Sequence, residues 1–261
     1  MLLKPKKSLG QNFLHDKNII DKIIQASGIS DKDVVLEIGP GTGNLTKFII
    51  NQKPKRLYVI EKDYRLAQDL EKKFLNKINI IVKDVLKVPE RFYSGKKFLI
   101  LGNLPYNIST KVLSTWCLSD KLKVSKMILM FQKEVADRII ADVNSREYSR
   151  ITILSNWKFD VRKIIDVKPN SFFPKPKVNS TVLEFIPKKK IHQIKDPKNL
   201  EMITRVFFSQ RRKMIKKPIK FLFRNFKFNF NKINIKPSDR PQNININKYL
   251  KIVNEYELLR N

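Results

Sequence analysis

The sequence predicts an α/β fold, in which a doubly wound, mainly parallel sheet is followed by a small helical domain. Short apolar runs of strand length alternate with segments of helical periodicity through most of the chain. Three of only seven glycines fall within five residues directly after the first such run. The last 75 residues show little strand character and carry a higher density of positive charge.

The elements follow in order along the chain. The first is a helix over Asn18 to Ser27, where isoleucines recur at helical spacing and Gly28 stands at the C-cap position. The predicted strands are Val34 to Ile38, Leu57 to Glu61, Ile78 to Val82, Phe98 to Leu101 and Met127 to Phe131. The later predicted helices are Tyr64 to Leu75 behind an Asp63 cap, Thr110 to Leu118 and Lys133 to Ala141. Ligands of such a sheet bind at the carboxyl ends of its strands.

A domain boundary is indicated where the periodic pattern is interrupted, between Ile186 and Asn199. Pro187, a lysine triplet and an Asp-Pro pair stand in this stretch, which is typical of a linker. We therefore expect an α/β domain over residues 1–186 and a basic helical domain over residues 187–261. The second domain should begin with a helix over Leu200 to Phe208.

Composition indicates a folded protein of the cytoplasm. The 261 residues are 42% hydrophobic, which suffices for a core, yet no apolar run approaches the length that spans a bilayer. Met1 to Leu14 contains no apolar segment of the kind that a signal peptide needs. Cys117 is the single cysteine, so no intramolecular disulfide can form. We expect no association with a membrane.

The charge balance points to a polyanionic partner. Lys and Arg number 54 against 24 Asp and Glu, which leaves +30. A lysine-rich compositional bias would spread such an excess evenly. Residues 187–261 hold 20 basic and 5 acidic side chains, a net +15, and the first 186 residues carry the other +15. The C-terminal segment is thus about two and a half times denser in positive charge, which favours a binding surface over bias.

The strongest chemical signal is the run Glu37-Ile38-Gly39-Pro40-Gly41-Thr42-Gly43. Its glycines lie directly after a predicted strand and before a predicted helix. Glycines at such a turn allow a ligand to approach the main chain. A tight turn without a ligand would need one glycine only, and the dinucleotide pattern G-x-G-x-x-G would need a small residue where Asn44 stands. The run resembles the E-x-G-x-G-x-G loop of class I, Rossmann-like S-adenosylmethionine methyltransferases. S-adenosylmethionine is therefore the expected cofactor, with Gly39 and Gly41 beside it.

Two acidic residues at strand ends support this interpretation. Glu61 closes the second predicted strand, where related folds bind ribose hydroxyls with a carboxylate. Asp84 follows the third strand and can accept a hydrogen bond from an adenine amine. Either residue alone would be an ordinary loop acid, but together with the glycine loop they form a set.

The fourth predicted strand ends in Gly102-Asn103-Leu104-Pro105-Tyr106-Asn107. An adenine amine is a poor nucleophile because its lone pair is delocalised into the ring. The side-chain oxygen of Asn103 and the carbonyl of Leu104 can accept its two hydrogens, Pro105 stiffens the loop, and Tyr106 offers a ring on which an extruded base can stack. A proline turn with a packed tyrosine is the alternative. The place beside the cofactor loop favours a catalytic role.

Several motifs together resemble those of the ribosomal RNA adenine dimethyltransferases, and the match covers nearly the whole chain. These motifs are Gln11-Asn12-Phe13-Leu14, the glycine loop, Asn103 to Ser109, Phe131 to Val135, Phe172 to Ser180, Gln210 to Lys213 and Arg240 to Tyr249. The last two resemble the C-terminal domain of the bacterial small-subunit enzymes. The resemblance implies contacts to the cofactor from Asn12, Leu14, Gly39, Glu61, Asp84 and Asn103.

The same resemblance implies that Phe172 stacks on the target adenine opposite Tyr106, and that the substrate is a pair of adjacent adenines in the 3'-terminal hairpin of 16S rRNA in the small ribosomal subunit. The chain departs from the family at Phe173, where a small residue is common, and at Lys175, which replaces a proline. The choice between Phe172 and Phe173 as the stacking ring therefore stays open.

Two other functions remain as alternatives. The sister family that methylates 23S rRNA and confers macrolide resistance shares the Pro-Lys-Pro-Lys-Val-Asn-Ser wording, but it typically reads N-I-P-Y-H and lacks the Gln-Arg-Arg-Lys run. A non-catalytic assembly protein could retain the fold. The intact Asn103 to Tyr106 loop argues against loss of activity.

The C-terminal segment supplies the expected RNA contacts. Arg is scarce, 13 against 41 Lys, so the pair within Arg211, Arg212 and Lys213 suits phosphate binding. The alternating phenylalanines from Phe221 to Phe230 are more typical of a small core. No ligand-spaced partners accompany His15 or His192, so we expect no metal. We expect the protein to act as a monomer.

Overall fold

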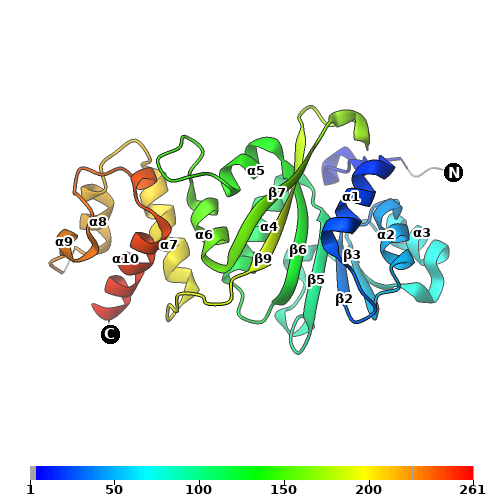
Figure 1. The fold of residues 1–261 in the computed structure, drawn as a ribbon, viewed down its shortest axis with the longest axis horizontal. Coiled ribbons are helices and arrows are strands. Elements are labelled where there is room, and N and C mark those ends of the chain that lie inside the picture. The colour runs from blue at the N-terminus through cyan, green and yellow to red at the C-terminus, as the bar shows by residue number, and fades with distance from the viewer. Residues whose placement is uncertain (1–3, 225, 261) are drawn as a thin grey trace. The chain divides into compact units, whose positions relative to one another are not determined.

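The computed structural model describes residues 4–224 and 226–260 (Figure 1). The expectations for Met1 to Leu3, for position 225 and for Asn261 lie outside this range. A seven-stranded sheet has the order β4-β3-β2-β5-β6-β9-β7. Its strands are β2 (Val34–Ile38), β3 (Arg56–Glu61), β4 (Asn79–Val82), β5 (Lys97–Asn103), β6 (Lys123–Gln132), β7 (Phe159–Val167) and β9 (Ser180–Pro187). The five from β4 to β6 are parallel, and β9 is antiparallel to β6.

Three helices connect parallel strands, namely α2 (Asn44–Asn51), α3 (Tyr64–Phe74) and α4 (Tyr106–Leu118). The helix α1 (Lys17–Ser27) precedes β2, α5 (Lys133–Ile139) follows β6, and only 3-10 turns lie between β4 and β5. Short 3-10 turns are η1 (Lys7–Leu9), η2 (Leu75–Lys77), η3 (Val85–Lys87), η4 (Glu90–Phe92) and η5 (Pro169–Ser171). The α4 helix begins at Tyr106, earlier than the periodicity suggested, so that the ring of Tyr106 stands at a helix start.

Helix ends follow local chemistry. The Asp16 side chain accepts hydrogen bonds from the first-turn amides of Asn18 and Ile19 in α1. Gly28 ends that helix in the left-handed conformation, with φ of 61°. The predicted Asp63 cap of α3 is confirmed, because its carboxylate accepts from Arg65 N at 3.2 Å.

A two-stranded antiparallel sheet lies outside the main sheet. It joins β1 (Phe13–Leu14) to β8 (Phe172–Phe173), with Phe13 opposite Phe173 and Leu14 opposite Phe172. Figure 1 shows the consequence, since the segment between β7 and β9 lies next to the N-terminal segment near α1. Two motifs about 160 residues apart in sequence are thereby brought together.

The chain divides into two compact units. The first comprises residues 1–116, 120–136 and 160–187, and the second comprises 117–119, 137–159 and 188–261. The sequence placed its boundary after residue 186, but the second unit also includes α6 (Arg150–Lys158), because this helix packs on α7 and α10. The chain therefore enters the helical unit before it completes the sheet.

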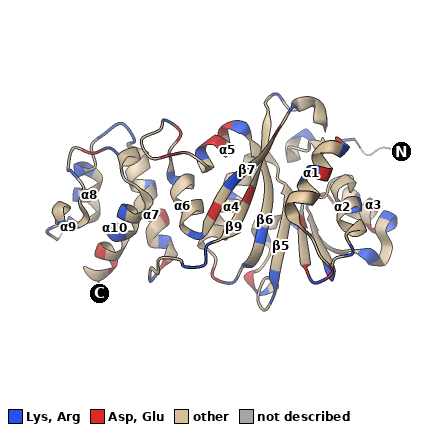
Figure 2. Cartoon of the chain, in the orientation of Figure 1, with Lys and Arg blue, Asp and Glu red and all other residues tan. Residues whose placement is uncertain are grey.

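The second unit is helical, with α7 (Pro197–Ser209), α8 (Lys216–Leu222), α9 (Phe230–Ile233), the turn η6 (Pro241–Asn243) and α10 (Ile246–Leu258). Figure 2 shows Lys and Arg on α8, α9 and α10. Its core holds Phe207 and Tyr249, whose ring centroids are 5.3 Å apart. The buried Glu257 of α10 accepts from the amides of Lys195 and Asp196, and so fixes the segment in front of α7.

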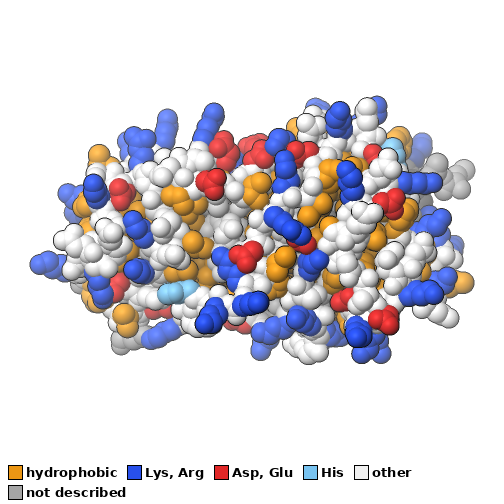
Figure 3. All heavy atoms as spheres, viewed as in Figure 1, with side chains coloured by type: hydrophobic (Ala, Val, Ile, Leu, Met, Phe, Trp, Pro, Cys, Tyr) orange, Lys and Arg blue, Asp and Glu red, His pale blue; other side chains and the backbone are white. Residues whose placement is uncertain are grey.

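Within the described residues, no helix combines the length and the apolar character that crossing a membrane requires. Figure 3 shows basic side chains scattered over both units, in agreement with a net +15 in each of the ranges 1–186 and 187–261.

Candidate active site

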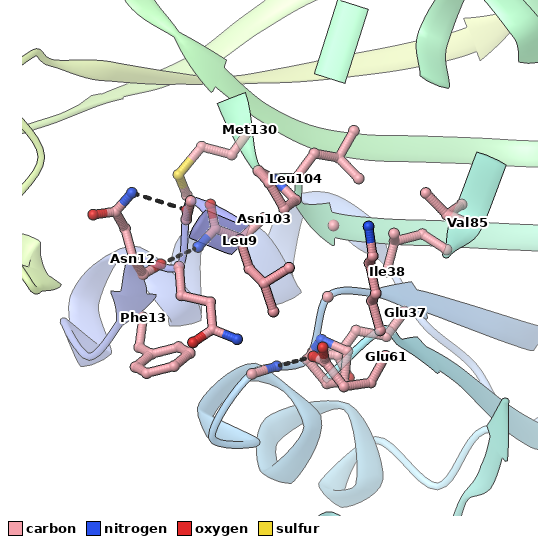
Figure 4. A pocket seen from close by; sticks show the side chains of 18 of the residues that line it. Leu9, Asn12, Phe13, Glu37, Ile38, Glu61, Val85, Asn103, Leu104 and Met130 are labelled. Carbon is pink, nitrogen blue, oxygen red and sulfur yellow. Dashed lines mark hydrogen bonds between the residues drawn. The ribbon is translucent and has the colours of Figure 1, made fainter. Parts of the chain in front are cut away.

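A pocket lies at the carboxyl ends of β2, β3 and β5, where a doubly wound sheet binds ligands (Figure 4). The N-terminal segment around η1 and β1 forms another wall. The predicted site residues that line the pocket are Asn12, Leu14, Gly39, Gly41, Glu61, Asp84, Asn103, Leu104, Pro105 and Tyr106. The pocket therefore brings together the glycine loop, both acidic strand ends and the Asn103 loop.

Both the backbone conformation of the loop and the atoms around it require glycine at positions 39 and 41. Gly39 and Gly41 have φ values of 66° and 58°, a region that disfavours other residues. A Cβ on Gly39 would lie 3.4 Å from the main-chain oxygen of Asn103, and one on Gly41 would lie 2.7 Å from Cδ1 of Phe13. Part of the need for glycine is thus the packing of the chain's own Phe13 over the loop, and not ligand access alone.

Glu61 is held at the end of β3 by two main-chain amides. Its Oε2 accepts from Gly41 N at 3.2 Å and its Oε1 accepts from Asp63 N at 2.8 Å. These bonds fix the carboxylate and leave further lone pairs that can accept ribose hydroxyls. Burial raises the pKa of Glu61, and the two amide hydrogen bonds oppose that rise.

Glu37 lies beside Glu61 and also lines the pocket (Figure 4). It is fully buried at the penultimate position of β2, and its Oε2 has no hydrogen-bond partner among the described residues. Burial raises the pKa of Glu37 to about 8, with a contribution from the nearby Glu61. Glu37 is therefore mainly neutral at neutral pH, so that two charges are not forced together.

Asp84 stands after β4 with both oxygens engaged. Oδ1 accepts from Leu86 N at 3.0 Å, and Oδ2 pairs with Lys62 Nζ at 3.0 Å. Partial burial acts to raise the pKa of Asp84, but these two hydrogen bonds outweigh it and lower the pKa below its usual value. Asp84 is therefore an ionised acceptor at the pocket edge.

Asn103 is oriented by the N-terminal segment. Its Nδ2 donates to the main-chain oxygen of Asn12 at 2.9 Å, across 91 residues of sequence (Figure 4). This bond engages one of the two amide hydrogens, and Oδ1 has no hydrogen-bond partner among the described residues. The atom left to act in the pocket is a hydrogen-bond acceptor, which is what an adenine amine requires.

Tyr106 is fixed at its hydroxyl end. Its OH lies 2.6 Å from Oγ of Ser180, a fully buried residue at the start of β9. Burial raises the pKa of Tyr106, so the ring stays neutral. Leu104 is buried. The carbonyl of Pro105 accepts a hydrogen bond from Ser109 N in the first turn of α4.

The N-terminal segment is tied to the site by two further bonds. Asn44 Nδ2 donates to the main-chain oxygen of Leu14 at 2.8 Å. Gln11 Nε2 donates to Asp63 Oδ2 at 3.1 Å, just beyond the Glu61 strand end. Asn44, whose size excludes the dinucleotide pattern, thus anchors the strand that carries Leu14.

Phe172 is not presented as the sequence suggested. It is 1% exposed and belongs to the apolar core, whereas Phe173 is 63% exposed. The register explains the difference, because Phe172 lies opposite the buried Leu14 and faces the core with it. Phe172 does not line the pocket in this conformation, so its stacking on a base stays a prediction.

The predicted RNA-binding run lies in the second unit, in the turn after α7. Arg211 is partly buried and donates through Nη2 to the carbonyl of Ser145 at 3.2 Å. Arg212 and Lys213 are exposed. Arg211 therefore has a structural bond that the sequence did not reveal, while its two neighbours are available to phosphates.

Other expectations are resolved by burial. Trp116 and Trp157 are core residues, and both histidines are exposed. Among the described residues, no group of His, Cys, Asp or Glu is arranged to hold a metal ion. The phenylalanine run divides, since Phe223 is buried while Phe221 is 66% exposed.

Sequence reasoning gave no role to several pocket residues. Lys62 and Val85 directly follow the two acidic strand ends, and this adjacency is a signal that could have found them. Ser180 is the last residue of the Phe172 to Ser180 motif, and the sequence predicts no role for it. Its contact with Tyr106 depends on tertiary structure.

The residues of the pocket fit S-adenosylmethionine. A fixed carboxylate at Glu61 suits a ribose, and the ionised Asp84 suits an adenine amine. Gly39 and Gly41, which have left-handed backbone conformations, place no side chain in the pocket wall near these two carboxylates. When bound there, this cofactor supplies an electrophilic methyl group.

The strand order, the antiparallel β9 and the pocket at the strand ends define a class I methyltransferase. A dimethyladenosine transferase from Plasmodium falciparum has a similar structure, with a TM-score of 0.81 and 28% identity over 94% of this chain and 98% of that one. The 23S rRNA methyltransferase ErmE matches at a TM-score of 0.67 and 21% identity over 94% of this chain and 100% of its own, and so supports the fold alone.

Residues 2–258 match the family described as ribosomal RNA adenine dimethylase, and the chain belongs to this family of S-adenosylmethionine-dependent enzymes. A relative from Pelagibacter ubique, ribosomal RNA small subunit methyltransferase A, is 53% identical over 262 residues and the full length of both chains. The protein of the same name from Malacoplasma penetrans is 40% identical over 94% of this chain and 90% of its own.

Proposed function

We propose that the protein transfers methyl groups from S-adenosylmethionine to the N6 amines of two adjacent adenines in the 3'-terminal hairpin of 16S rRNA, during biogenesis of the small subunit. The full-length likeness to small subunit methyltransferases A supports this substrate over 23S rRNA. The observation that carries the chemistry is the orientation of Asn103, whose amide nitrogen is bound to Asn12 O.

In this proposal, the side chain of Asn103 accepts one hydrogen of the amine through Oδ1, and the carbonyl of Leu104 accepts the other. Both contacts localise the nitrogen lone pair so that it can attack the methyl group. Tyr106 supports one face of the extruded base, with its hydroxyl fixed by Ser180. The remaining rate enhancement comes from proximity and alignment.

Cofactor contacts are proposed for Asn12, Leu14, Gly39, Gly41, Glu61, Asp84 and Asn103, and RNA contacts for Arg211, Arg212 and Lys213. We propose a monomer as the active form. Because the proposed substrate is a ribosomal subunit, we place the activity in the cytoplasm.

The test incubates the protein with labelled cofactor and unmethylated small subunits, and then maps modified nucleotides by mass spectrometry. Label in two adjacent adenines of the 3'-terminal hairpin is the expected result. Label in 23S rRNA alone would establish the macrolide-resistance type of activity, and no transfer at all would favour a non-catalytic assembly factor.

The matched variant is Asn103→Ala, which removes the acceptor but no phosphate contact. It should abolish transfer with at most a modest loss of RNA affinity. Near-normal turnover by this variant would contradict the assignment of the Asn103 loop.

A further inference from the structure

The loop between β8 and β9 carries exposed groups that the proposed function does not use. Phe173 is 63% exposed and Val178 is 43% exposed, and Lys175 and Lys177 are exposed between them. Residues 167–183 contain three lysines and no acidic residue. Neither Lys175 nor Lys177 has an ion-pair or hydrogen-bond partner within the described part of the chain.

Both ends of this loop are attached to the active site. At its start, Phe173 lies directly opposite Phe13 in the two-stranded sheet, and directly opposed residues of antiparallel strands project from the same face. Phe13 lines the pocket and lies against Gly41. Phe173 therefore projects from the same face of the two-stranded sheet as Phe13 and is exposed there, while Phe172 and Leu14 project from the other face and are buried.

The end of the loop is fixed by the substrate side of the pocket. Ser180 follows the loop directly and contacts the hydroxyl of Tyr106 at 2.6 Å. Before the loop, Ser171 Oγ donates to Asp16 Oδ2 at 2.8 Å, and its carbonyl accepts from His15 N. These four attachments fix the loop beside Tyr106 and the N-terminal wall.

An exposed apolar ring with adjacent unpaired cations is the combination that binds single-stranded nucleic acid. The ring stacks on a base, and the lysines contact phosphates. A protein partner would be expected to bury the ring in an apolar surface, whereas this ring is flanked by charges of one sign. The chemistry thus favours RNA.

We propose that Phe173, Lys175 and Lys177 bind the single-stranded RNA that flanks the target adenine, with Phe173 stacking on a neighbouring base and the lysines contacting its phosphates. This inference rests on the proposed function. It gives Phe173 a role distinct from holding the methylated base.

Steady-state kinetics on unmethylated small subunits test the stacking. Phe173→Ala should raise KM by about 5- to 160-fold, the range that corresponds to one base–aromatic stack. The value of kcat and the affinity for cofactor should be unchanged, and Phe173→Trp should restore KM. Val178→Ala, which removes exposed apolar surface from the same loop but no ring, is the matched control and should resemble the wild type.

The Phe173→Trp variant also provides a direct signal, because a synthetic single-stranded RNA that contains two adjacent adenines should quench its emission more than that of the wild type, whose Trp116 and Trp157 are buried. Lys175→Ala with Lys177→Ala should flatten the dependence of log affinity on log salt by about 1 to 2 units.

An unchanged KM for Phe173→Ala, or unquenched emission from the tryptophan variant, would overturn the inference. A fall in kcat that tryptophan does not restore would also overturn it, since it would indicate a packing role. Wild-type transfer to small subunits is measured in the same series, so failure of the proposed function is recognised separately.

Discussion

Glu37→Gln should remove a pH-dependent loss of stability. Burial raises the pKa of Glu37 to about 8 in the folded protein, from 4.5. The folded state then binds this proton more tightly than the unfolded state does. Its contribution to the free energy of unfolding is complete below about pH 4.5 and is lost as the pH rises through 8.

The magnitude follows from that difference. Between the two pKa values, the free energy of unfolding falls by up to about 1.4 kcal/mol per pH unit, so a loss of roughly 4 to 5 kcal/mol is the upper bound. Relaxation around the carboxylate and its coupling to Glu61 make the actual loss smaller than this bound. We expect the free energy of unfolding to fall by about 2 kcal/mol or more between pH 5 and pH 8.5.

Urea denaturation of the wild type and of Glu37→Gln at four pH values measures this difference. A glutamine cannot ionise, so any cost of its amide is a constant offset. Glu71→Gln, on the exposed surface of α3, is the matched control and should follow the wild-type pH dependence. Parallel curves for wild type and Glu37→Gln would refute the reasoning.

Three further predictions concern the site. Glu61→Ala should weaken cofactor binding by roughly 10- to 100-fold, because a ribose would lose its acceptor; calorimetry showing unchanged affinity would contradict this. Replacing Arg211, Arg212 and Lys213 by alanine would flatten the dependence of log RNA affinity on log salt by roughly 2 to 3 units if each side chain contacts a phosphate. Because Arg211 is bound to Ser145, the double replacement of Arg212 and Lys213 should give about 1.4 to 1.8 units, measured by filter binding. Ser180→Ala and Tyr106→Phe should raise KM by similar factors, and the double variant should be no worse than either; additive effects would show that the two hydroxyls act separately.

The five parallel strands were predictable from apolar runs, which are continuous in β2 and β5 because these strands are buried on both faces. The edge strand β4 was found from its apolar run although none of its residues is buried, and the buried β9 was not predicted. The β7 strand was missed, since exposed and partly exposed residues interrupt its pattern. The assignment of residues 137–159 to the helical unit was also missed, because α6 has no single apolar face that indicates its neighbours.

The site was predictable in so far as each residue is fixed by a local motif. Gly39, Glu61 and Asn103 all stand at strand ends, and parallel strands bring such ends to one edge. The missing information is tertiary. The burial of Phe172 follows from its pairing with Leu14, and the bond of Arg211 to Ser145 joins segments 66 residues apart. No local pattern predicts either contact.

The bond from Asn103 to the carbonyl of Asn12 also distinguishes two nearly isosteric side chains. An aspartate at position 103 would keep the acceptor oxygens that the chemistry requires, but it would direct one of them at a carbonyl oxygen. Repulsion between the two acceptors would turn the side chain or displace residues 10–14. The N-terminal segment therefore favours an amide over a carboxylate at position 103.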